Sequence, residues 1–212
     1  MIVLGAYVAD IAVSPLAPWA DRDPWFLTAR AGEIVGALLQ DLDGGYVADD
    51  GVAVHATARI EAGAVVKPPA ILGPGCFVAA GAYLRGGVWL QADAVVGPGA
   101  ELKSSFVFSG GKLAHFNFVG DAVLGRDVNL EAGAVIANYR NERADKNIVI
   151  ALDGAALDTG VDKFGALIGD RARIGANAVI APGAVLEPDT VVARLALIDQ
   201  GMADEIITGR NP

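Results

Sequence analysis

The stretch 72-LGPGCFVAAGAYLRGGVWLQADAVVGPGAELK-103 repeats a short pattern with a period of six residues. Counting from residue 54, an aliphatic residue opens each unit, a small residue follows four places later, and nine consecutive units keep this register. The aliphatic column is Val54, Ile60, Val66, Leu72, Val78, Leu84, Leu90, Val96 and Leu102. The small column is Ala58, Ala64, Ala70, Cys76, Ala82, Val88, Ala94, Ala100 and Phe106. Glycine is frequent just before the small column, where it lets the chain turn through unusual dihedral angles.

This repetition predicts an all-β solenoid in which each unit forms a very short strand and a turn. It is the hexapeptide-repeat signature, in which three units close one triangular coil of a parallel β-helix. The coils stack at about 4.8 Å, and each buries the apolar face of its neighbour. Known folds with this repeat are left-handed, against the usual rule for parallel crossovers. By that resemblance we expect a left-handed parallel β-helix over residues 54–192.

The register is interrupted in 110-GGKLAHFNFVG-120, which contains His115. Aliphatic residues then resume a six-residue spacing out of step with the first units, at Phe118, Leu124, Leu130 and Ile136. The first phase returns at Ile168, Ile174, Ile180, Leu186 and Val192. We interpret the interruption as an irregularity that lifts His115 out of the wall of the solenoid.

Three segments lie outside the repeats. Residues 1–53 contain Asp23-Pro24 before an amphipathic run that ends near Gly44-Gly45, which predicts one capped helix. Residues 138–165 form a long excursion, and loops of this length in compact domains are usually functional or disordered. Residues 193–212 form a C-terminal tail in which we expect a short helix.

The composition restricts the classes of partner and compartment. A net charge of −9 makes nucleic acid an unfavourable partner, so any phosphate site needs a local cluster of cations. No apolar run is long enough to predict a membrane span, and the N-terminus lacks the basic region of a signal peptide. A single cysteine suits a reducing compartment, so we expect a cytoplasmic protein. We expect Cys76, Trp19, Trp25 and Trp89 to be packing residues.

A local cluster of cations is present in the repeats. Because three units make one coil, residues 18 apart in sequence lie above one another. The second position of the six-residue unit is occupied at this spacing by Lys67, Arg85 and Lys103. Like charges at coil spacing repel by about 1 kcal/mol per pair in water, and an anionic ligand would relieve that repulsion. We therefore predict that this column binds an anion.

The runs 101-ELKSSFVFSGGKLAHFNFVGDAVLGRDVNLEAGAVIANY-139 and 158-DTGVDKFGALIGDRARIGANAVIAPG-183 carry a family resemblance. The first resembles the acetyltransferase domain of the bifunctional N-acetylglucosamine-1-phosphate uridyltransferases, and the second resembles their archaeal sugar-1-phosphate nucleotidyltransferase relatives. The likeness covers residues 54–192 and extends to the lead-in at Pro24-Trp25. The nucleotidyltransferase domain of that family has no counterpart in residues 1–53, so uridylyl transfer is not expected of this chain.

The resemblance implies transfer of an acetyl group from acetyl-CoA to the amine of a hexosamine 1-phosphate, in nucleotide-sugar biosynthesis, by a homotrimer with sites between neighbouring solenoids. It makes His115 the general base, a role that suits an unperturbed imidazole at neutral pH. Substrate-binding roles are implied for Arg85, Lys103, Asn129, Asn138 and Tyr139. The backbone near Ala132 and Ala176 would hold the pantetheine arm of the co-substrate.

Two departures from the family pattern concern the acceptor sugar. Phe118 stands where the family has a tyrosine that binds substrate. The family's lysine after Asn-Tyr falls at Ala144, so Arg143 or Lys146 is its candidate replacement.

Other functions stay open. The solenoid could bind sugar phosphate without catalysis, or acetylate another amino sugar or a hydroxyl. The carbonic anhydrase built on this solenoid requires three histidine ligands for zinc. Since the chain has only His55 and His115, we set that function aside and expect no metal site.

Overall fold

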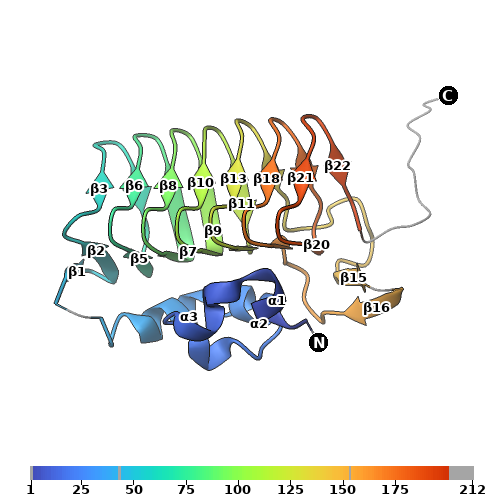
Figure 1. Cartoon of the computed structure of the whole chain (residues 1–212), viewed down its shortest axis with the longest axis horizontal. Helices are drawn as coiled ribbons and strands as arrows, with labels where there is room; N and C mark the ends of the chain where they lie inside the picture. Colours follow the sequence, from blue (N-terminus) through green and yellow to red (C-terminus); the bar gives the residue numbers. More distant parts are fainter. Residues whose placement is uncertain (1, 43, 153, 201–212) are drawn as a thin grey trace.

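The computed structural model describes residues 2–42, 44–152 and 154–200, which form a parallel β-helix with a helical segment packed along one face (Figure 1). A seven-stranded sheet forms the first face: β3 (Arg59–Ile60), β6 (Phe77–Val78), β8 (Val95–Val96), β10 (Lys112–Leu113), β13 (Asn129–Leu130), β18 (Arg173–Ile174) and β21 (Val191–Val192). The second face contains β4 (Val65–Val66), the first parts of β7 (Tyr83–Leu90) and β9 (Glu101–Val107), β11 (Phe118–Gly120), β14 (Val135–Ile136), β19 (Val179–Ile180) and β22 (Leu197–Ile198). The third face contains β2 (Val52–His55), β5 (Ala70–Leu72), the last parts of β7 and β9, β12 (Val123–Leu124), β17 (Ala166–Ile168) and β20 (Ala184–Leu186).

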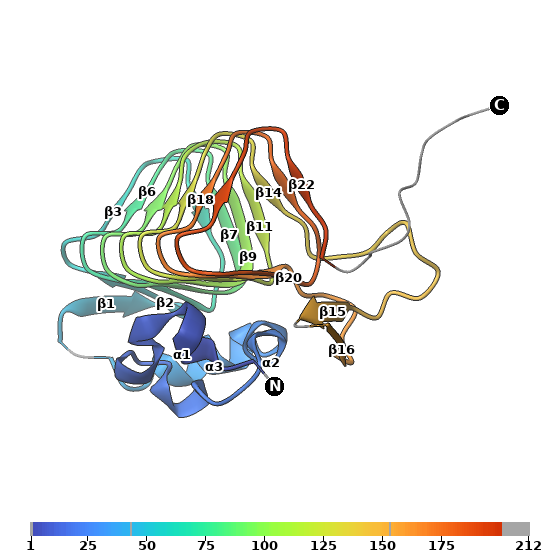
Figure 2. The same cartoon turned by 45° about the vertical axis from the view of Figure 1, so that its right-hand side comes forward.

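The solenoid is left-handed, as predicted. Figure 2 brings the C-terminal coils toward the viewer, and the chain there passes from β18 on the left to the column of β14 and β22 on the right, then to β20 below. It therefore turns clockwise while advancing toward the viewer, which defines a left-handed coil. Each internal strand pairs in parallel with the coils before and after it, which satisfies the backbone hydrogen bonds.

The core confirms the aliphatic column from Leu72 to Leu102 and the small column from Ala70 to Ala100. The assignment of Phe106 to the small column is wrong, because Ser105 lies opposite Val88 and Phe106 packs in the second hydrophobic cluster. Leu72, Val78, Leu84, Leu90 and Val96 are fully buried along the axis of the solenoid. Cys76 belongs to the same core, as predicted, and burial raises the pKa of its thiol to about 11.

The predicted place of the register change is wrong. Leu102 is paired with Val119, so Val119 continues the core column and Phe118 is only half-buried. The spacing from Leu113 to Val119 remains six residues, so the register is intact across His115. The steps from Leu102 to Val107 and from Val119 to Leu124 are five residues each, so each of these two corners is one residue shorter. Counting sixes cannot locate this loss, because Phe118 and Val119 are both apolar.

The N-terminal segment contains more than the single helix that the sequence predicts. Its elements are α1 (Leu4–Tyr7), η1 (Ala9–Val13), η2 (Ala17–Trp19), α2 (Pro24–Ala29), α3 (Ala31–Leu38) and β1 (Tyr46–Asp49). The predicted helix is divided at Arg30, whose backbone angles (φ −113°, ψ 21°) are not helical. Gly87 explains how closely α3 approaches β7, since a Cβ there would lie 2.5 Å from the carbonyl carbon of Ala31.

The helical segment covers the third face of the solenoid (Figures 1 and 2). Trp19, Trp25 and Trp89 pack in a second hydrophobic cluster at this contact, as predicted. The buried carboxylate of Asp170 accepts hydrogen bonds from the backbone N–H groups of Ala9 and Arg126, at 3.1 and 2.8 Å. No helix among the described residues is long and apolar enough to cross a membrane.

The 138–165 excursion leaves the solenoid after β14 and contains an antiparallel hairpin, β15 (Val149–Leu152) and β16 (Ala155–Asp158). Arg140 at its base is 2% exposed. Its guanidinium donates to both carboxylate oxygens of Asp199 at 2.6 Å and to the carbonyl of Pro182 at 2.9 Å, and the contact with Asp199 raises the pKa of Arg140. The excursion is therefore anchored to the last described coil.

That coil extends past the predicted solenoid boundary at residue 192. The strand β22 occupies Leu197–Ile198, within the tail for which the sequence predicts a short helix. The rest of that predicted helix, over residues 201–212, lies outside the described residues.

Candidate active site

The corner between the second and third faces contains a cavity of about 420 Å³, here called the corner cavity. This is the corner at which two coils are one residue short and from which the 138–165 excursion leaves the solenoid. Five of the predicted substrate-binding residues contribute to its lining, together with two residues that sequence analysis did not single out. The lining is Arg85, Lys103, Phe118, Asn138, Tyr139, Asp162 and Lys163.

The predicted cation column is present, but carboxylates neutralise part of it. Arg85 is paired opposite Lys103, and the backbone N–H of Lys67 donates to the carbonyl of Leu84, so the three residues lie on successive coils. Arg85 donates to Glu101 at 2.7–2.8 Å. Lys103 donates to both oxygens of Asp121 at 2.8 and 2.7 Å. Lys67 is exposed and does not line the corner cavity. Carboxylates of the chain therefore relieve part of the repulsion for which sequence analysis considered only an anionic ligand.

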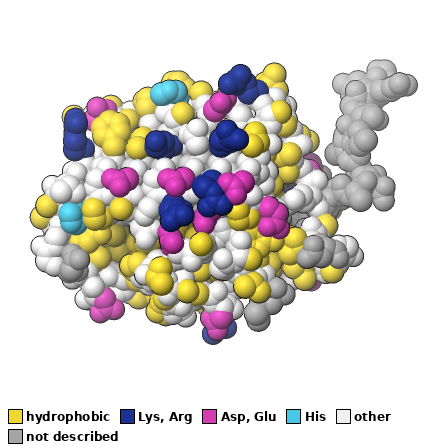
Figure 3. Space-filling view, viewed as in Figure 1, with side chains coloured by type: hydrophobic (Ala, Val, Ile, Leu, Met, Phe, Trp, Pro, Cys, Tyr) yellow, Lys and Arg dark blue, Asp and Glu magenta, His cyan; other side chains and the backbone are white. Residues whose placement is uncertain are grey.

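Figure 3 shows the same mixing of charges on a larger scale. Lys and Arg side chains on the face in view lie beside Asp and Glu side chains and form no large patch of one sign. The positive potential available to an anion is therefore local, at a few placed side chains.

Asp121 does not itself line the corner cavity but binds two residues that do, Lys103 and Asn138, and sequence analysis missed it. It is 4% exposed, its φ is +48°, and its carboxylate accepts hydrogen bonds from Lys103 and from the side-chain amide of Asn138. Gly120 makes this approach possible, since a Cβ there would lie 2.6 Å from Nδ2 of Asn138. The sequence signal that could have identified it is the Gly120-Asp121 pair within the run 101–139 that carries the family resemblance.

Neither candidate replacement for the family's lysine, Arg143 or Lys146, lines the cavity. The ammonium of Lys146 donates to the carbonyl oxygens of Arg140, Asn141 and Arg143, and lies 5.3 Å from the centre of the Tyr139 ring. Lys146 therefore stabilises the turn at residues 140–146 through hydrogen bonds and packs against the ring of Tyr139. The lysine that lines the cavity is Lys163, which arrives from the far end of the same excursion.

The predicted catalytic and co-substrate positions gather at a different corner, between the first and second faces. The backbone N–H of Gly133 donates to the carbonyl of His115, and that of Asn177 donates to the carbonyl of Ala132. These bonds place His115, Ala132 and Ala176 one above another on successive coils. The side chain of His115 is exposed and has no hydrogen-bond partner among the described residues.

The predicted co-substrate position at Ala176 already has a partner. Its backbone N–H donates to Glu131 at 2.9 Å, and Arg194 donates to the same carboxylate at 2.9 Å. The contacts with Arg194, and then with Ala176, lower the pKa of Glu131.

One predicted residue belongs to neither group. Asn129 lies in β13 on the first face, paired with Lys112 and Arg173 on the adjacent strands.

The two groups lie at opposite edges of the second face. His115 precedes β11 and Gly120 ends it, five residues later, so roughly 15 Å of extended chain separates the two edges. Within one chain, therefore, His115 does not reach the corner cavity.

The chain is similar in sequence to known proteins. No family model matches the chain. It is 39% identical over 88 residues to a bifunctional sugar-1-phosphate nucleotidylyltransferase/acetyltransferase of Sulfurisphaera tokodaii, an alignment that covers 42% of this chain and 21% of that protein. It is 32% identical over 194 residues to the bifunctional protein GlmU of Methanococcus maripaludis, covering 88% of this chain and 46% of that protein. The chain thus spans less than half the length of either relative.

Among solved structures, the acetyltransferase domain of PglB from Neisseria gonorrhoeae aligns with 67% of this chain and 54% of that chain, at 18% identity and a TM-score of 0.39. The family relationship rests on the sequence alignments. The chain is a homologue of the bifunctional GlmU and sugar-1-phosphate nucleotidylyltransferase/acetyltransferase proteins.

Proposed function

We propose that the chain is an acetyl-CoA-dependent N-acetyltransferase that acts on an amino-sugar 1-phosphate such as glucosamine 1-phosphate or galactosamine 1-phosphate. The observation that carries this proposal is the corner cavity, which combines three cations and the carboxylate of Asp162 with a tyrosine, an asparagine amide and the ring of Phe118. The cations suit a phosphate group, and the amide and ring suit the hydroxyl groups and the apolar face of a sugar.

In this proposal, Lys163 and the Arg85 hydrogen atoms not used by Glu101 bind the phosphate. Lys103 is held by Asp121, so it contributes charge from a fixed position. Asn138 and Tyr139 bind the sugar hydroxyls. Phe118 contributes a ring face without the hydroxyl of the family's tyrosine, and this difference selects among amino sugars.

The chemistry is a direct acyl transfer. The amine nitrogen attacks the thioester carbonyl of acetyl-CoA, the new C–N bond forms, and the C–S bond breaks. The neutral imidazole of His115 accepts the proton from the amine and returns it to the departing thiolate, so CoA leaves as the thiol. General base catalysis of this kind contributes roughly 10²–10⁴-fold in rate. Ala132 and Ala176 would lie along the pantetheine arm.

A homotrimer is part of the proposal, because the two edges of the second face are apart in one chain and adjacent copies would bring them together. Exposed apolar side chains on this face and at the His115 corner support it, since such surfaces mark contacts between proteins. They are Val65, Phe116, Val179, Leu195 and Leu197.

The test is release of CoA from acetyl-CoA over a panel of amino-sugar 1-phosphates and the matching sugars without phosphate. We expect turnover with at least one phosphorylated amine, a loss of at least 100-fold in His115→Ala, and a raised KM for the sugar phosphate in Lys163→Ala. Turnover that is unchanged in His115→Ala would remove the assigned base.

The alternative is a solenoid that binds sugar phosphate without catalysis. Phe118 in place of tyrosine, and the absence of a described partner that orients His115, favour it. Binding of the sugar phosphates with no CoA release across the panel would support this alternative, whereas release with a hydroxyl acceptor would identify a different acyltransferase.

A further inference from the structure

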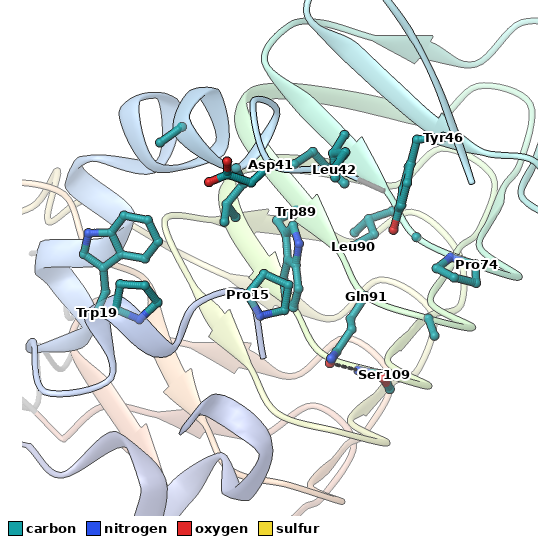
Figure 4. A pocket seen from close by; sticks show the side chains of 16 residues that line it. Pro15, Trp19, Asp41, Leu42, Tyr46, Pro74, Trp89, Leu90, Gln91 and Ser109 are labelled. Atoms are coloured by element: carbon teal, nitrogen blue, oxygen red, sulfur yellow. Dashed lines mark hydrogen bonds between the residues drawn. The ribbon is translucent and has the colours of Figure 1, made fainter. Parts of the chain in front are cut away.

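A second cavity, of about 600 Å³, lies between the N-terminal segment and the third face of the solenoid, and we call it the helix-side cavity (Figure 4). The strand β7 contributes Trp89 and Leu90, while Trp19 and Leu38 come from the helical segment. None of its lining residues belongs to the corner cavity or to the His115 corner. Its volume is within the range of pockets that bind small organic molecules, about 300–1,000 Å³.

Trp89 provides a hydrogen-bond donor in the wall of this cavity. It is 4% exposed, and its ring packs edge-to-face against Phe108 with the ring centroids 5.2 Å apart. Its indole N–H has no hydrogen-bond partner among the described residues. In Figure 4 the ring nitrogen lies on the side of Tyr46 and Leu90, within the group of lining residues. The nitrogen is not among the fully buried side-chain atoms without a partner, so it is open to the cavity. An acceptor atom on a ligand would therefore form a hydrogen bond with it.

Gln91 provides a second donor on the same side. Its side-chain oxygen accepts a hydrogen bond from the backbone N–H of Ser109 at 3.1 Å, shown dashed in Figure 4. The NH₂ group of that amide makes no hydrogen bond within the described part of the chain. Two donors therefore serve this cavity in addition to its aromatic walls.

The charge of the cavity selects against anions. Asp41 is the only charged residue among the described residues that line it, and its carboxylate forms no ion pair with any of them. A phosphate in this cavity would meet a like charge and no cation, whereas an amino or cationic group would gain an acceptor. The lining of the corner cavity differs, since it contains three cations, Arg85, Lys103 and Lys163, and one carboxylate, Asp162.

We propose that the helix-side cavity binds a flat heteroaromatic molecule without negative charge, of the size of a nucleobase or nucleoside. The ligand accepts a hydrogen bond from Trp89, presents an amino group to Asp41, and stacks its ring on the aromatic walls formed with Trp19 and Tyr46. This site goes beyond the proposed acetyl transfer, since it shares no residue with that machinery.

The test is isothermal titration calorimetry of the full chain with adenosine, which has acceptor nitrogens, an exocyclic amino group and no charge. Adenosine 5′-monophosphate is the matched probe that adds only a phosphate. We expect saturable binding of adenosine and binding of the monophosphate at least tenfold weaker. Trp89→Phe should weaken adenosine binding about five- to tenfold, as expected for the loss of one hydrogen bond. Asp41→Asn should reduce the difference in affinity between adenosine and adenosine 5′-monophosphate.

Asp49→Asn is the control, because it removes the same charge from an exposed position on β1 outside the cavity, and we expect it to bind both probes like the wild type. If Trp89→Phe does not fold, Gln91→Ala replaces it with the same expectation. Absence of saturable adenosine binding, equal affinity for the two probes, or affinities unchanged in all cavity variants would overturn the proposal. A change of solution mass in Asp41→Asn without adenosine binding would assign the cavity to a second copy of the chain and also overturn it.

Discussion

At the scale of single residues, Asp121 shows how one buried carboxylate organises the corner cavity. It occupies a left-handed backbone position in a shortened corner and fixes both Lys103 and Asn138. The carboxylate holds the ammonium at the cavity, while Arg85 has its own partner, Glu101. Asp121 is therefore a positioning residue under the proposed function.

We predict that Asp121→Asn lowers the free energy of unfolding by about 2–3 kcal/mol, because it leaves Lys103 without its counter-charge in a mostly buried position. Chemical denaturation monitored by circular dichroism measures this change. Asp189→Asn is the matched control, since its partner Arg171 is exposed, and we expect almost no effect there. Equal effects of the two substitutions would show that burial does not strengthen the Lys103–Asp121 contact.

Cys76 gives a second prediction at this scale. Burial raises the pKa of its thiol to about 11, so the native thiol stays protonated and should react with a disulfide reagent at least 100-fold more slowly than the unfolded chain. The protonated thiol makes its full contribution to the free energy of unfolding below the pKa of the thiol in the unfolded chain, near 8.5. This contribution is lost as the pH rises toward 11. Rapid labelling of the native protein at neutral pH would contradict the buried position.

At the scale of elements, the 138–165 excursion carries one wall of the corner cavity. Its first end contributes Asn138 and Tyr139 to the lining, and its last end contributes Asp162 and Lys163. The buried guanidinium of Arg140 anchors its base to Asp199 and Pro182, and Lys146 closes the turn that follows. The excursion is thus held in place by charge-assisted hydrogen bonds.

We predict that Arg140→Ala destabilises the protein by about 3 kcal/mol, because it removes the bidentate donor of the Asp199 carboxylate and leaves the carbonyl of Pro182 without the Arg140 donor. Hydrogen exchange should accelerate over residues 141–163 while the coils before residue 130 stay protected. Arg140→Lys keeps the charge but cannot donate to both carboxylate oxygens as a planar fork, so it should restore only part of the protection. Uniform acceleration across the chain would indicate global destabilisation without a local anchoring role.

At the scale of the whole molecule, the second face separates the two halves of the proposed active site. His115, Ala132 and Ala176 lie at one edge, and the corner cavity lies at the other. A rotationally symmetric assembly places one edge of each copy against the other edge of its neighbour.

We predict that light scattering gives a solution mass three times the 21.7 kDa of the chain. Mixed assemblies of His115→Ala and Arg85→Ala subunits should recover about a quarter of the wild-type activity, because random mixing pairs an intact His115 with an intact Arg85 in that share of the sites. Neither variant alone should be active. No recovery in mixed assemblies would show that both residues act within one chain.

The sequence by itself determined the solenoid. A period of six residues admits few structures that bury every aliphatic residue of the column, and nine units in register predict a stack of triangular coils. The spacing of 18 also predicts that Arg85 and Lys103 are neighbours, because stacking follows from the period alone. The motifs that carry the family resemblance point to the residues that gather at the two edges.

Only the tertiary structure decided which coils lose a residue, which partners the cations have and where the excursion returns. The missing residues fall at corners, where either Phe118 or Val119 satisfies the apolar pattern, so the register depends on pairing with the neighbouring strand. Asp121, Lys163 and Trp89 acquire their roles from chain segments far away in sequence, and no local pattern encodes such contacts. The separation of His115 from the corner cavity is likewise a property of the folded coil, since residues five apart lie on opposite edges of a face only when the chain between them is extended.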